Sequence, residues 1–280
     1  MRIVVASGKG GTGKTTIATS LALTAESVRF MDCDVEAPNA ALFLNPTLDM
    51  RKEVGILLPV VDESLCTYCG RCAEVCEFHA IAVVGKKILV FPELCHGCGS
   101  CTMICPENAI HERLDVVGVL ESGTTPKGVN FSHGVMNVGK PMAVPIIREL
   151  KKWDTARGDI EIRDAPPGAS CPVVETIRGA DFVLLVTEPT PFGLHDLKQV
   201  TGIVQELGIP AGVVINRDGI GNNETESYCV EAGLPILLRI PMERRLAEAI
   251  ASGKTLVDAA PEYRAAFEDL LQDITTRVAA

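Results

Sequence analysis

The sequence predicts an α/β protein, a doubly wound and mostly parallel sheet with a smaller α+β domain inserted into it. The first observation is an apolar run, a glycine-rich loop and a helical pattern that follow one another within residues 3–25. The second is an alternation of short apolar runs with helical patterns in the C-terminal half, typical of parallel strands joined by crossover helices. The third is a cysteine-rich repeat. We therefore expect a discontinuous domain formed by residues 1–59 and 113–280, with residues 60–112 inserted.

The composition limits the partners and the compartment. A net charge of -10 makes the chain a poor ligand for a phosphate backbone, so we expect no nucleic-acid partner. The chain does not open with a basic segment and a long apolar stretch, and no apolar run reaches the roughly 18 to 20 residues of a membrane span. We expect a cytoplasmic protein. Its eleven cysteines are clustered, which indicates metal or redox chemistry rather than disulfides.

The first element is a phosphate-binding loop. Residues 3–6 form an apolar run that predicts a strand, residues 8–15 fit G-x-x-x-x-G-K-S/T, and residues 17–25 continue as a helix. Lys14 is expected to reach the β and γ phosphates of a nucleotide, and the Thr15 hydroxyl to bind Mg²⁺. The alternative is a glycine-rich turn without a ligand. The residues expected to contact the nucleotide here are Gly8, Gly10, Gly11, Thr12, Gly13, Thr15 and Thr16.

Lys9 has no role in that general motif. The run K-G-G-x-G-K-T-T that contains it resembles the deviant Walker A loop of the MinD/ParA/Mrp and nitrogenase iron protein group of P-loop ATPases. In that group the first lysine reaches the nucleotide of the facing subunit. The resemblance therefore implies ATP hydrolysis and an ATP-dependent dimer, either a homodimer or a heterodimer with a paralogous ATPase, in which Lys9 compensates charge at the transferred phosphoryl group. The alternative is a solvated loop lysine.

Further segments resemble the same family. After the expected strand 28–32, Asp34 stands where the family has the aspartate that orients the attacking water. Residues 159–164 resemble the Walker B strand, which implies that Asp164 holds the magnesium shell and that the Gly168 amide senses the γ phosphate. Because this strand contains Glu161 and Arg163, we expect it to be partly exposed.

Three more apolar runs, residues 182–186, 212–215 and 234–240, predict parallel strands. Ligands of such sheets bind beyond the carboxyl ends of the strands. Asn216, Arg217 and Pro241 follow two of these runs, and they resemble the adenine contacts of the family. An asparagine after a strand can also be a simple turn former.

The cysteines of residues 60–112 form an internal repeat with a period of 29 residues, C-x2-C-x2-C-x3-C followed by the same spacing. This is the spacing of bacterial ferredoxins, in which three cysteines bind one 4Fe-4S cluster and the fourth binds the other. Zinc is the alternative, although structural zinc sites space their cysteine pairs more widely. We expect one cluster on Cys66, Cys69, Cys72 and Cys105, and a second on Cys95, Cys98, Cys101 and Cys76.

Three cysteines lie outside the repeat. Cys33 and Cys229 are expected to be small buried hydrophobic residues, and Cys171 to have a structural or contact role, since no second cysteine lies between Cys105 and Asp164 to complete a cluster between subunits. The C-terminal stretch 261–278 is amphipathic with an acid-rich polar face, which argues against a basic membrane anchor.

These features predict a MgATP-binding and ATP-hydrolysing dimer that carries two 4Fe-4S clusters. Three functions remain open for it. The first is ATP-gated electron transfer to an unidentified redox partner, and the second is assembly or delivery of iron-sulfur clusters to an apo-acceptor protein. The third is spatial organisation, as in MinD or ParA, with the ferredoxin domain as a sensor.

Overall fold

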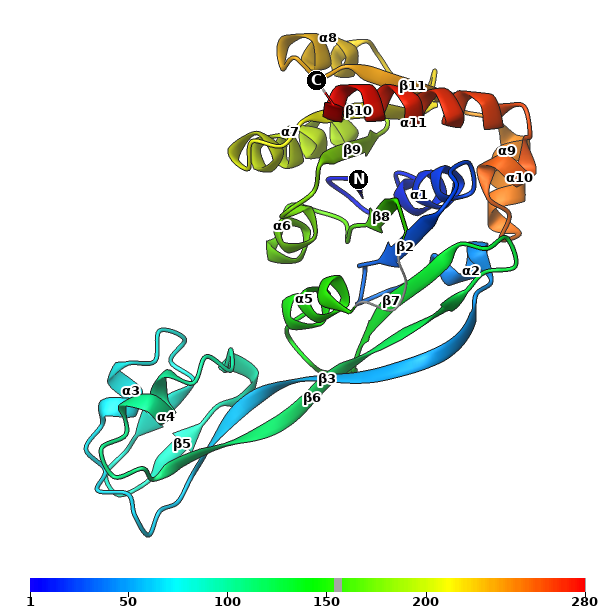
Figure 1. Cartoon of the computed structure of the whole chain (residues 1–280). Helices are drawn as coiled ribbons and strands as arrows, with labels where there is room; N and C mark the ends of the chain where they lie inside the picture. Colours follow the sequence, from blue (N-terminus) through cyan, green and yellow to red (C-terminus); the bar gives the residue numbers. More distant parts are fainter. Residues whose placement is uncertain (154–157, 280) are drawn as a thin grey trace.

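The computed structural model describes residues 1–153 and 158–279, and its centre is one large sheet (Figure 1). The strands of this sheet are β1 (Arg2–Ala6), β2 (Val28–Asp32), β3 (Thr47–Val61), β6 (Ile110–Thr124), β7 (Asn130–Met136), β8 (Ile160–Asp164), β9 (Phe182–Thr187), β10 (Ala211–Asp218) and β11 (Ile236–Pro241). Their order is β11-β10-β9-β1-β8-β2-β7-β6-β3. All neighbours from β11 to β7 are parallel, whereas β6 is antiparallel to both β7 and β3. The predicted mostly parallel α/β sheet is therefore confirmed.

Helices cover both faces of the sheet (Figure 1). One face packs against α1 (Lys14–Ala22), α9 (Arg244–Ala251), α10 (Leu256–Ala259) and α11 (Tyr263–Ala279), and the short α2 (Ala41–Leu44) adds Leu44 there. The other face packs against α5 (Val144–Lys152), α6 (Cys171–Ile177), α7 (Pro191–Glu206) and α8 (Glu224–Glu231). The amphipathic C-terminal stretch is a helix, as predicted, and buries Phe267, Leu270 and Ile274. No helix among the described residues is long and apolar enough to cross a membrane.

The expectation that the 159–164 strand is partly exposed is wrong for its second half. β8 lies between β1 and β2, and Arg163 is only 4% exposed. Its guanidinium group bonds the Glu161 carboxylate at 2.6 Å through Nη2 and the Thr176 carbonyl oxygen at 3.1 Å through Nη1. A buried charge is tolerated when it is paired and hydrogen-bonded, so this central strand accommodates a residue that its position disfavours.

The chain leaves the sheet along a two-stranded arm (Figure 1). β3 and β6 have 15 residues each and pair antiparallel from Thr47 opposite Thr124 to Val61 opposite Ile110. The predicted domain boundaries at 59/60 and 112/113 fall near the far end of this ladder. This arm was not predicted from the sequence, because the burial of β3 alternates regularly only from Val54 to Leu58.

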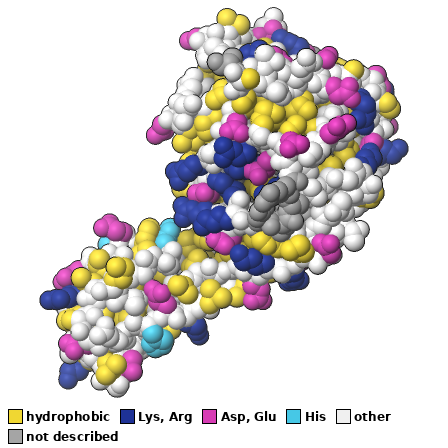
Figure 2. Space-filling view, in the orientation of Figure 1, with side chains coloured by type: hydrophobic (Ala, Val, Ile, Leu, Met, Phe, Trp, Pro, Cys, Tyr) yellow, Lys and Arg dark blue, Asp and Glu magenta, His cyan; other side chains and the backbone are white. Residues whose placement is uncertain are grey.

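The arm carries a small lobe that stands apart from the main body (Figure 2). It contains α3 (Arg71–Glu74), β4 (Ile81–Val83), β5 (Ile88–Val90), the 3-10 helix η1 (Pro92–Leu94) and α4 (Ser100–Ile104). The 29-residue period is visible in its backbone, because left-handed residues recur at the same separation. These pairs are Tyr68 and Gly97, Gly70 and Gly99, and His79 and Asn108. The sequence repeat is therefore also a structural repeat.

We predict that Arg163→Met destabilises the fold by about 1–3 kcal/mol, because the Thr176 carbonyl loses a buried donor and Glu161 loses its nearest cation. Chemical denaturation measures this. Arg244→Met is the matched control, since Arg244 forms only an exposed pair with Glu248 one helical turn away. Equal stability of the two variants would show that the buried guanidinium contributes nothing.

Candidate nucleotide site and cysteine pockets

The predicted phosphate loop joins the carboxyl end of β1 to α1, so that Lys14 and Thr15 begin the helix. Both are bonded to one carboxylate. Lys14 Nζ donates to Asp164 Oδ1 at 2.6 Å, and Thr15 Oγ1 donates to Asp164 Oδ2 at 2.6 Å. Asp164 is fully buried at the end of β8, beside β1. The structure therefore brings together the residues that the sequence assigned to phosphate and magnesium.

A second buried carboxylate, Asp32, lies beside Asp164 at the end of β2. Burial, and then the charge of Asp164, raise the pKa of Asp32 to about 7. Its oxygens accept hydrogen bonds from the backbone of the loop formed by residues 34–39 and of the residue after it, donated by Asp34 N at 3.1 Å, Asn39 N at 3.0 Å and Ala40 N at 2.9 Å. Asp34 lies in this loop, and burial raises the pKa of its carboxyl also. Asp32 thus holds the loop that carries the expected catalytic aspartate.

Lys9 is partly buried in this structure, with 31% of its side chain exposed. Its ammonium group is paired with the Glu188 carboxylate, which also accepts from Arg217 Nη1 at 2.9 Å. Burial works to raise the pKa of Glu188, but the hydrogen bond and charge of Lys9, with Arg217, outweigh it and hold that pKa below its usual range. Arg217 Nη2 donates further to the Gly11 carbonyl oxygen at 2.9 Å. Glu188 therefore links Lys9 of the phosphate loop to Arg217, which also bonds the loop backbone at Gly11.

A cleft of about 280 Å³ continues from the loop toward α9. Asn216 Nδ2 donates to the Thr12 carbonyl at 2.7 Å, and a side chain on Gly13 would meet that nitrogen at 2.3 Å. Glycine is therefore required at position 13, where φ is also +89°. The cleft walls combine the predicted Thr16, Asn216, Arg217 and Pro241 with unpredicted neighbours, among them Met242, Glu243, Leu246, Ile250 and Leu256. An apolar cleft with a few polar groups suits a nucleoside.

The remaining predicted nucleotide contacts lie on or beside the loop. The Thr12 hydroxyl is buried and has no hydrogen-bond partner among the described residues, which leaves it available to a ligand. Gly168 is at φ +100°, and its amide donates to the Ser7 carbonyl at 3.0 Å, not toward the centre of the loop. Gly8 packs against the backbone of Asp196 in α7, whereas Gly10 and Gly11 have open space around them.

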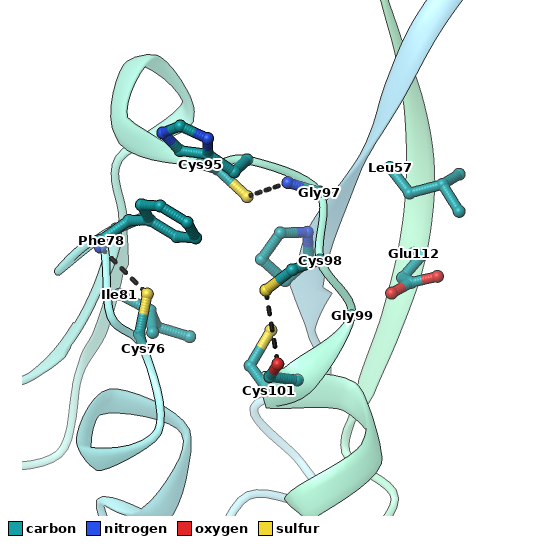
Figure 3. A pocket seen from close by; sticks show the side chains of 14 residues that line it. Leu57, Cys76, Phe78, Ile81, Cys95, Gly97, Cys98, Gly99, Cys101 and Glu112 are labelled. Atoms are coloured by element: carbon teal, nitrogen blue, oxygen red, sulfur yellow. Dashed lines mark hydrogen bonds between the residues drawn. The ribbon is translucent and has the colours of Figure 1, made fainter. Parts of the chain in front are cut away.

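Eight cysteines of the lobe line two pockets, and each pocket takes three from one repeat and one from the other. One pocket, called proximal because Leu57 of β3 also lines it, contains Cys76, Cys95, Cys98 and Cys101. Figure 3 shows the sulfur atoms of these cysteines turned toward a common space. The distal pocket is lined by Cys66, Cys69, Cys72 and Cys105. These are the two sets that the ferredoxin spacing predicts.

Backbone amides donate to sulfur in both pockets at matching positions. Tyr68 N and Gly97 N each bond the cysteine two residues earlier at 3.4 Å, and Ala80 N and Ala109 N each bond the cysteine four residues earlier at 3.3 Å. Amides directed at sulfur stabilise thiolates, which are the ligands of iron-sulfur clusters. Among the described residues no group of three or more His, Cys, Asp or Glu side chains lies close enough to hold a single metal ion.

Most of the chain matches a known nucleotide-binding domain. Residues 3–257 match the family described as CbiA, the CobQ/CobB/MinD/ParA nucleotide binding domain. The chain belongs to this family. An uncharacterized protein of Methanocaldococcus jannaschii is 31% identical over 267 residues, which is 92% of this chain and 91% of that protein.

Solved structures of the family share the fold. The septum site-determining protein MinD complexed with Mg-ADP from Pyrococcus horikoshii has a TM-score of 0.58 at 19% identity, covering 98% of this chain and 95% of that one. MinD in a MinC:MinD complex from Aquifex aeolicus has a TM-score of 0.57 at 17% identity, with coverages of 98% and 96%. A MinD/ParA-type, mostly parallel P-loop fold is therefore established for this chain.

Sequence reasoning missed Glu188 and the role of Asp32. Each follows or ends a parallel strand at its carboxyl end, Glu188 after β9 and Asp32 in β2, which is where ligand-binding residues of such sheets lie. Their position at the carboxyl ends of strands could therefore have identified both residues as candidates for the site. Their function as buried partners of the Walker A loop and of the 34–39 loop depends on strand order, which the sequence does not state.

We predict that Glu188→Gln tightens MgATP binding by about 3- to 10-fold, because Lys9 and Arg217 keep their charge beside the phosphate site and lose the carboxylate that neutralises them. Calorimetric titration at two salt concentrations measures this, and the gain is expected to shrink at high salt. Glu243→Gln is the control, since Glu243 lines the same cleft but pairs with Arg245. Weaker binding by Glu188→Gln would mean that Glu188 instead organises the loop.

Proposed function

We propose that this member of the CobQ/CobB/MinD/ParA family is a dimeric MgATP-hydrolysing protein that carries two 4Fe-4S clusters on its lobe and couples nucleotide-driven closure to electron transfer with a redox partner. The observation that carries the proposal is the pair of four-cysteine pockets attached by a continuous arm to a Walker A site. A 4Fe-4S cluster accepts and releases one electron at a time.

The nucleotide site supplies the groups that hydrolysis needs. Lys14 would move from Asp164 to the β and γ phosphates, and Thr15 and Asp164 would then hold Mg²⁺ between them. Asp34, on the loop fixed by Asp32, would orient the attacking water. Lys9 would leave Glu188 and reach the nucleotide of the facing protomer. Asn216, Arg217 and Pro241 would receive the adenosine in the apolar cleft.

The lobe offers a docking surface for the partner. Large hydrophobic side chains are exposed on it beside acidic and basic ones (Figure 2), and exposed apolar patches on a protein surface mark interaction sites. The most exposed are Leu65, Val84, Leu94 and Met103. Because these residues lie next to or between the pocket cysteines in the sequence, we propose that the redox partner binds to the lobe.

Spatial organisation is the second candidate, favoured by the similarity of the fold to MinD over 98% of this chain. One of those similar structures is a complex of MinD with MinC, so a protein partner would be expected for this function also. The lobe cysteines have no necessary role in it. Cluster delivery, as in Mrp-type carriers, is a third candidate, and it requires that iron leave the protein.

One experiment separates the three functions. The protein, purified without oxygen and reduced, is mixed with a redox dye and an apo-acceptor, with and without MgATP. We expect MgATP to change the rate of dye reduction while iron stays on the protein. Transfer of iron to the acceptor would favour the carrier, and an ATP effect on neither would favour the spatial organiser.

Lys9→Ala is the matched variant for that experiment. It is expected to bind ATP through the intact Lys14 loop, yet to lose the ATP-dependent dimer, ATP turnover and any nucleotide effect on the dye. Light scattering and phosphate release measure the first two losses. Lys86→Ala, on the lobe surface, is the control. Normal turnover by Lys9→Ala would remove the proposed role of Lys9 across the dimer.

We predict that Cys76→Ser damages the cluster of the proximal pocket, although Cys76 is nearer in sequence to Cys66, Cys69 and Cys72. Iron content and EPR spectra measure the loss. Cys105→Ser should damage the distal cluster instead, and Cys171→Ser, outside the lobe, should leave both intact. If each variant lost the cluster of its own repeat, the exchange of the fourth ligand would be wrong.

A further inference from the structure

The two cysteine pockets differ in what surrounds them, despite their shared repeat. The proximal pocket is walled by Leu57 and Pro59 of β3 and by Glu112 of β6. The distal pocket meets the arm only at Val61 and Ile110, the last pair of its ladder. The proximal pocket is therefore built partly from the arm, whereas the distal pocket is built beyond it.

A continuous apolar cluster joins the proximal pocket to the base of the nucleotide site. At one end it contains Met31, Cys33 and Val35, which flank Asp32 and Asp34. At the other end it contains Cys95, with Cys76 packed against it. The cluster also contains residues of the arm and of α5, together with Ala80 of the lobe and Ala143, which caps α5. The arm and α5 residues are Val54, Ile56, Leu58, Val117, Leu120, Ile146, Ile147 and Leu150. No cysteine of the distal pocket belongs to this cluster among the described residues.

The 34–39 loop is fastened directly to the cluster. The Val35 carbonyl accepts from Met136 N at 2.8 Å, at the end of β7. Val35 also packs with Ile146 over Gly134, where a side chain would meet both of them at 2.7 Å. Displacement of Val35 would therefore press on α5 and, through it, on the arm, because close-packed interiors transmit strain and do not absorb it.

The proximal copy of the cysteine repeat packs closely against the arm at Gly97. A Cβ at this position would lie 3.2 Å from the Ile56 Cβ and from the Leu57 backbone nitrogen and oxygen. Its partner in the other repeat is Tyr68, which has nearly the same left-handed backbone, φ +58° against +64°, and yet carries a large, half-buried side chain. The conformation thus accepts a side chain in the distal copy, whereas a side chain in the proximal copy would crowd β3.

We propose that the proximal pocket senses the state of the nucleotide site through this packed cluster, and that the distal pocket does not. Nucleotide contacts would move the 34–39 loop, Val35 would shift the α5 and β3 side chains beneath it, and the backbone around Cys95 and Gly97 would respond. The inference rests on the proposed nucleotide binding and assigns its regulatory effect to one pocket of the two.

Hydrogen exchange of the purified protein, with and without a non-hydrolysable ATP analogue and Mg²⁺, tests the inference without depending on turnover. Segments 91–101 and 62–72 are repeat partners and contain equivalent amide-to-sulfur bonds at Gly97 and Tyr68. We expect exchange in 91–101 to change about 5-fold or more, the lower end of typical coupling between sites, and exchange in 62–72 to stay unchanged.

Gly97→Ala is the test variant and Gly70→Ala its control. Both place alanine at a left-handed glycine, with φ +64° and +82°, but only Gly97 has neighbours within 4 Å. Gly97→Ala should abolish the nucleotide effect on 91–101, and Gly70→Ala should preserve it. Ile56→Val removes one methylene from the cluster and changes no residue of the lobe itself, and it should reduce the effect if Gly97→Ala does not fold.

The same exchange data separate this inference from the function on which it rests. Protection of residues 7–16 reports nucleotide binding, and iron analysis of the same sample reports the clusters. Protected 7–16 with equal changes in both lobe segments, with a change only in 62–72, or with none in either would overturn the sensing role while leaving nucleotide binding intact. Unprotected 7–16 would refute nucleotide binding and the inference with it.

Discussion

The buried carboxylate of Asp164 is the interaction on which the rest of the site depends. It lies at the end of β8 between β1 and β2, and it neutralises Lys14 while it fixes the Thr15 hydroxyl. A lysine buried without such a partner would be strongly disfavoured. Because β8 also sets the position of β2, the same strand brings Asp32 next to Asp164 and so places the 34–39 loop. One strand thereby positions both the cation site and the loop expected to respond to it.

Much of this arrangement could be predicted from the sequence, because it follows local rules. The Walker A loop needs glycines at fixed spacing before a helix, and strands β9 to β11 are recognisable in the sequence as apolar runs. Other parts depend on contacts between distant segments. Arg163 looked unsuited to a central strand because one of its partners, the Thr176 carbonyl, is in α6 and reaches it only once that helix is folded beside β8. The pairing of Lys9 with Glu188 could not be predicted for the same reason, since Glu188 lies 179 residues away.

In the cysteine lobe, the sequence predicts the features that the two repeats share but not the features that distinguish them. Its period of 29 residues predicts which cysteines share a pocket, and the backbone repeats the same left-handed positions and the same amide-to-sulfur bonds. What the repeat cannot predict is the difference between its halves. That difference arises from the arm, whose strand β3 packs against Gly97. Neither the residue types nor the cysteine spacing predicts where this long antiparallel ladder ends.

The arm has one more consequence, because β3 is the last strand of the sheet and its outer edge is unpaired among the described strands. A long open edge invites the addition of a strand from another molecule. In its first half β3 carries Asp49, Arg51, Lys52 and Glu53, whose charges would resist such a neighbour. In its second half, β3 contacts the lobe, because Gly97 packs against Leu57. Removal of the lobe would therefore uncover the Leu57 backbone, which Gly97 closely approaches in this structure.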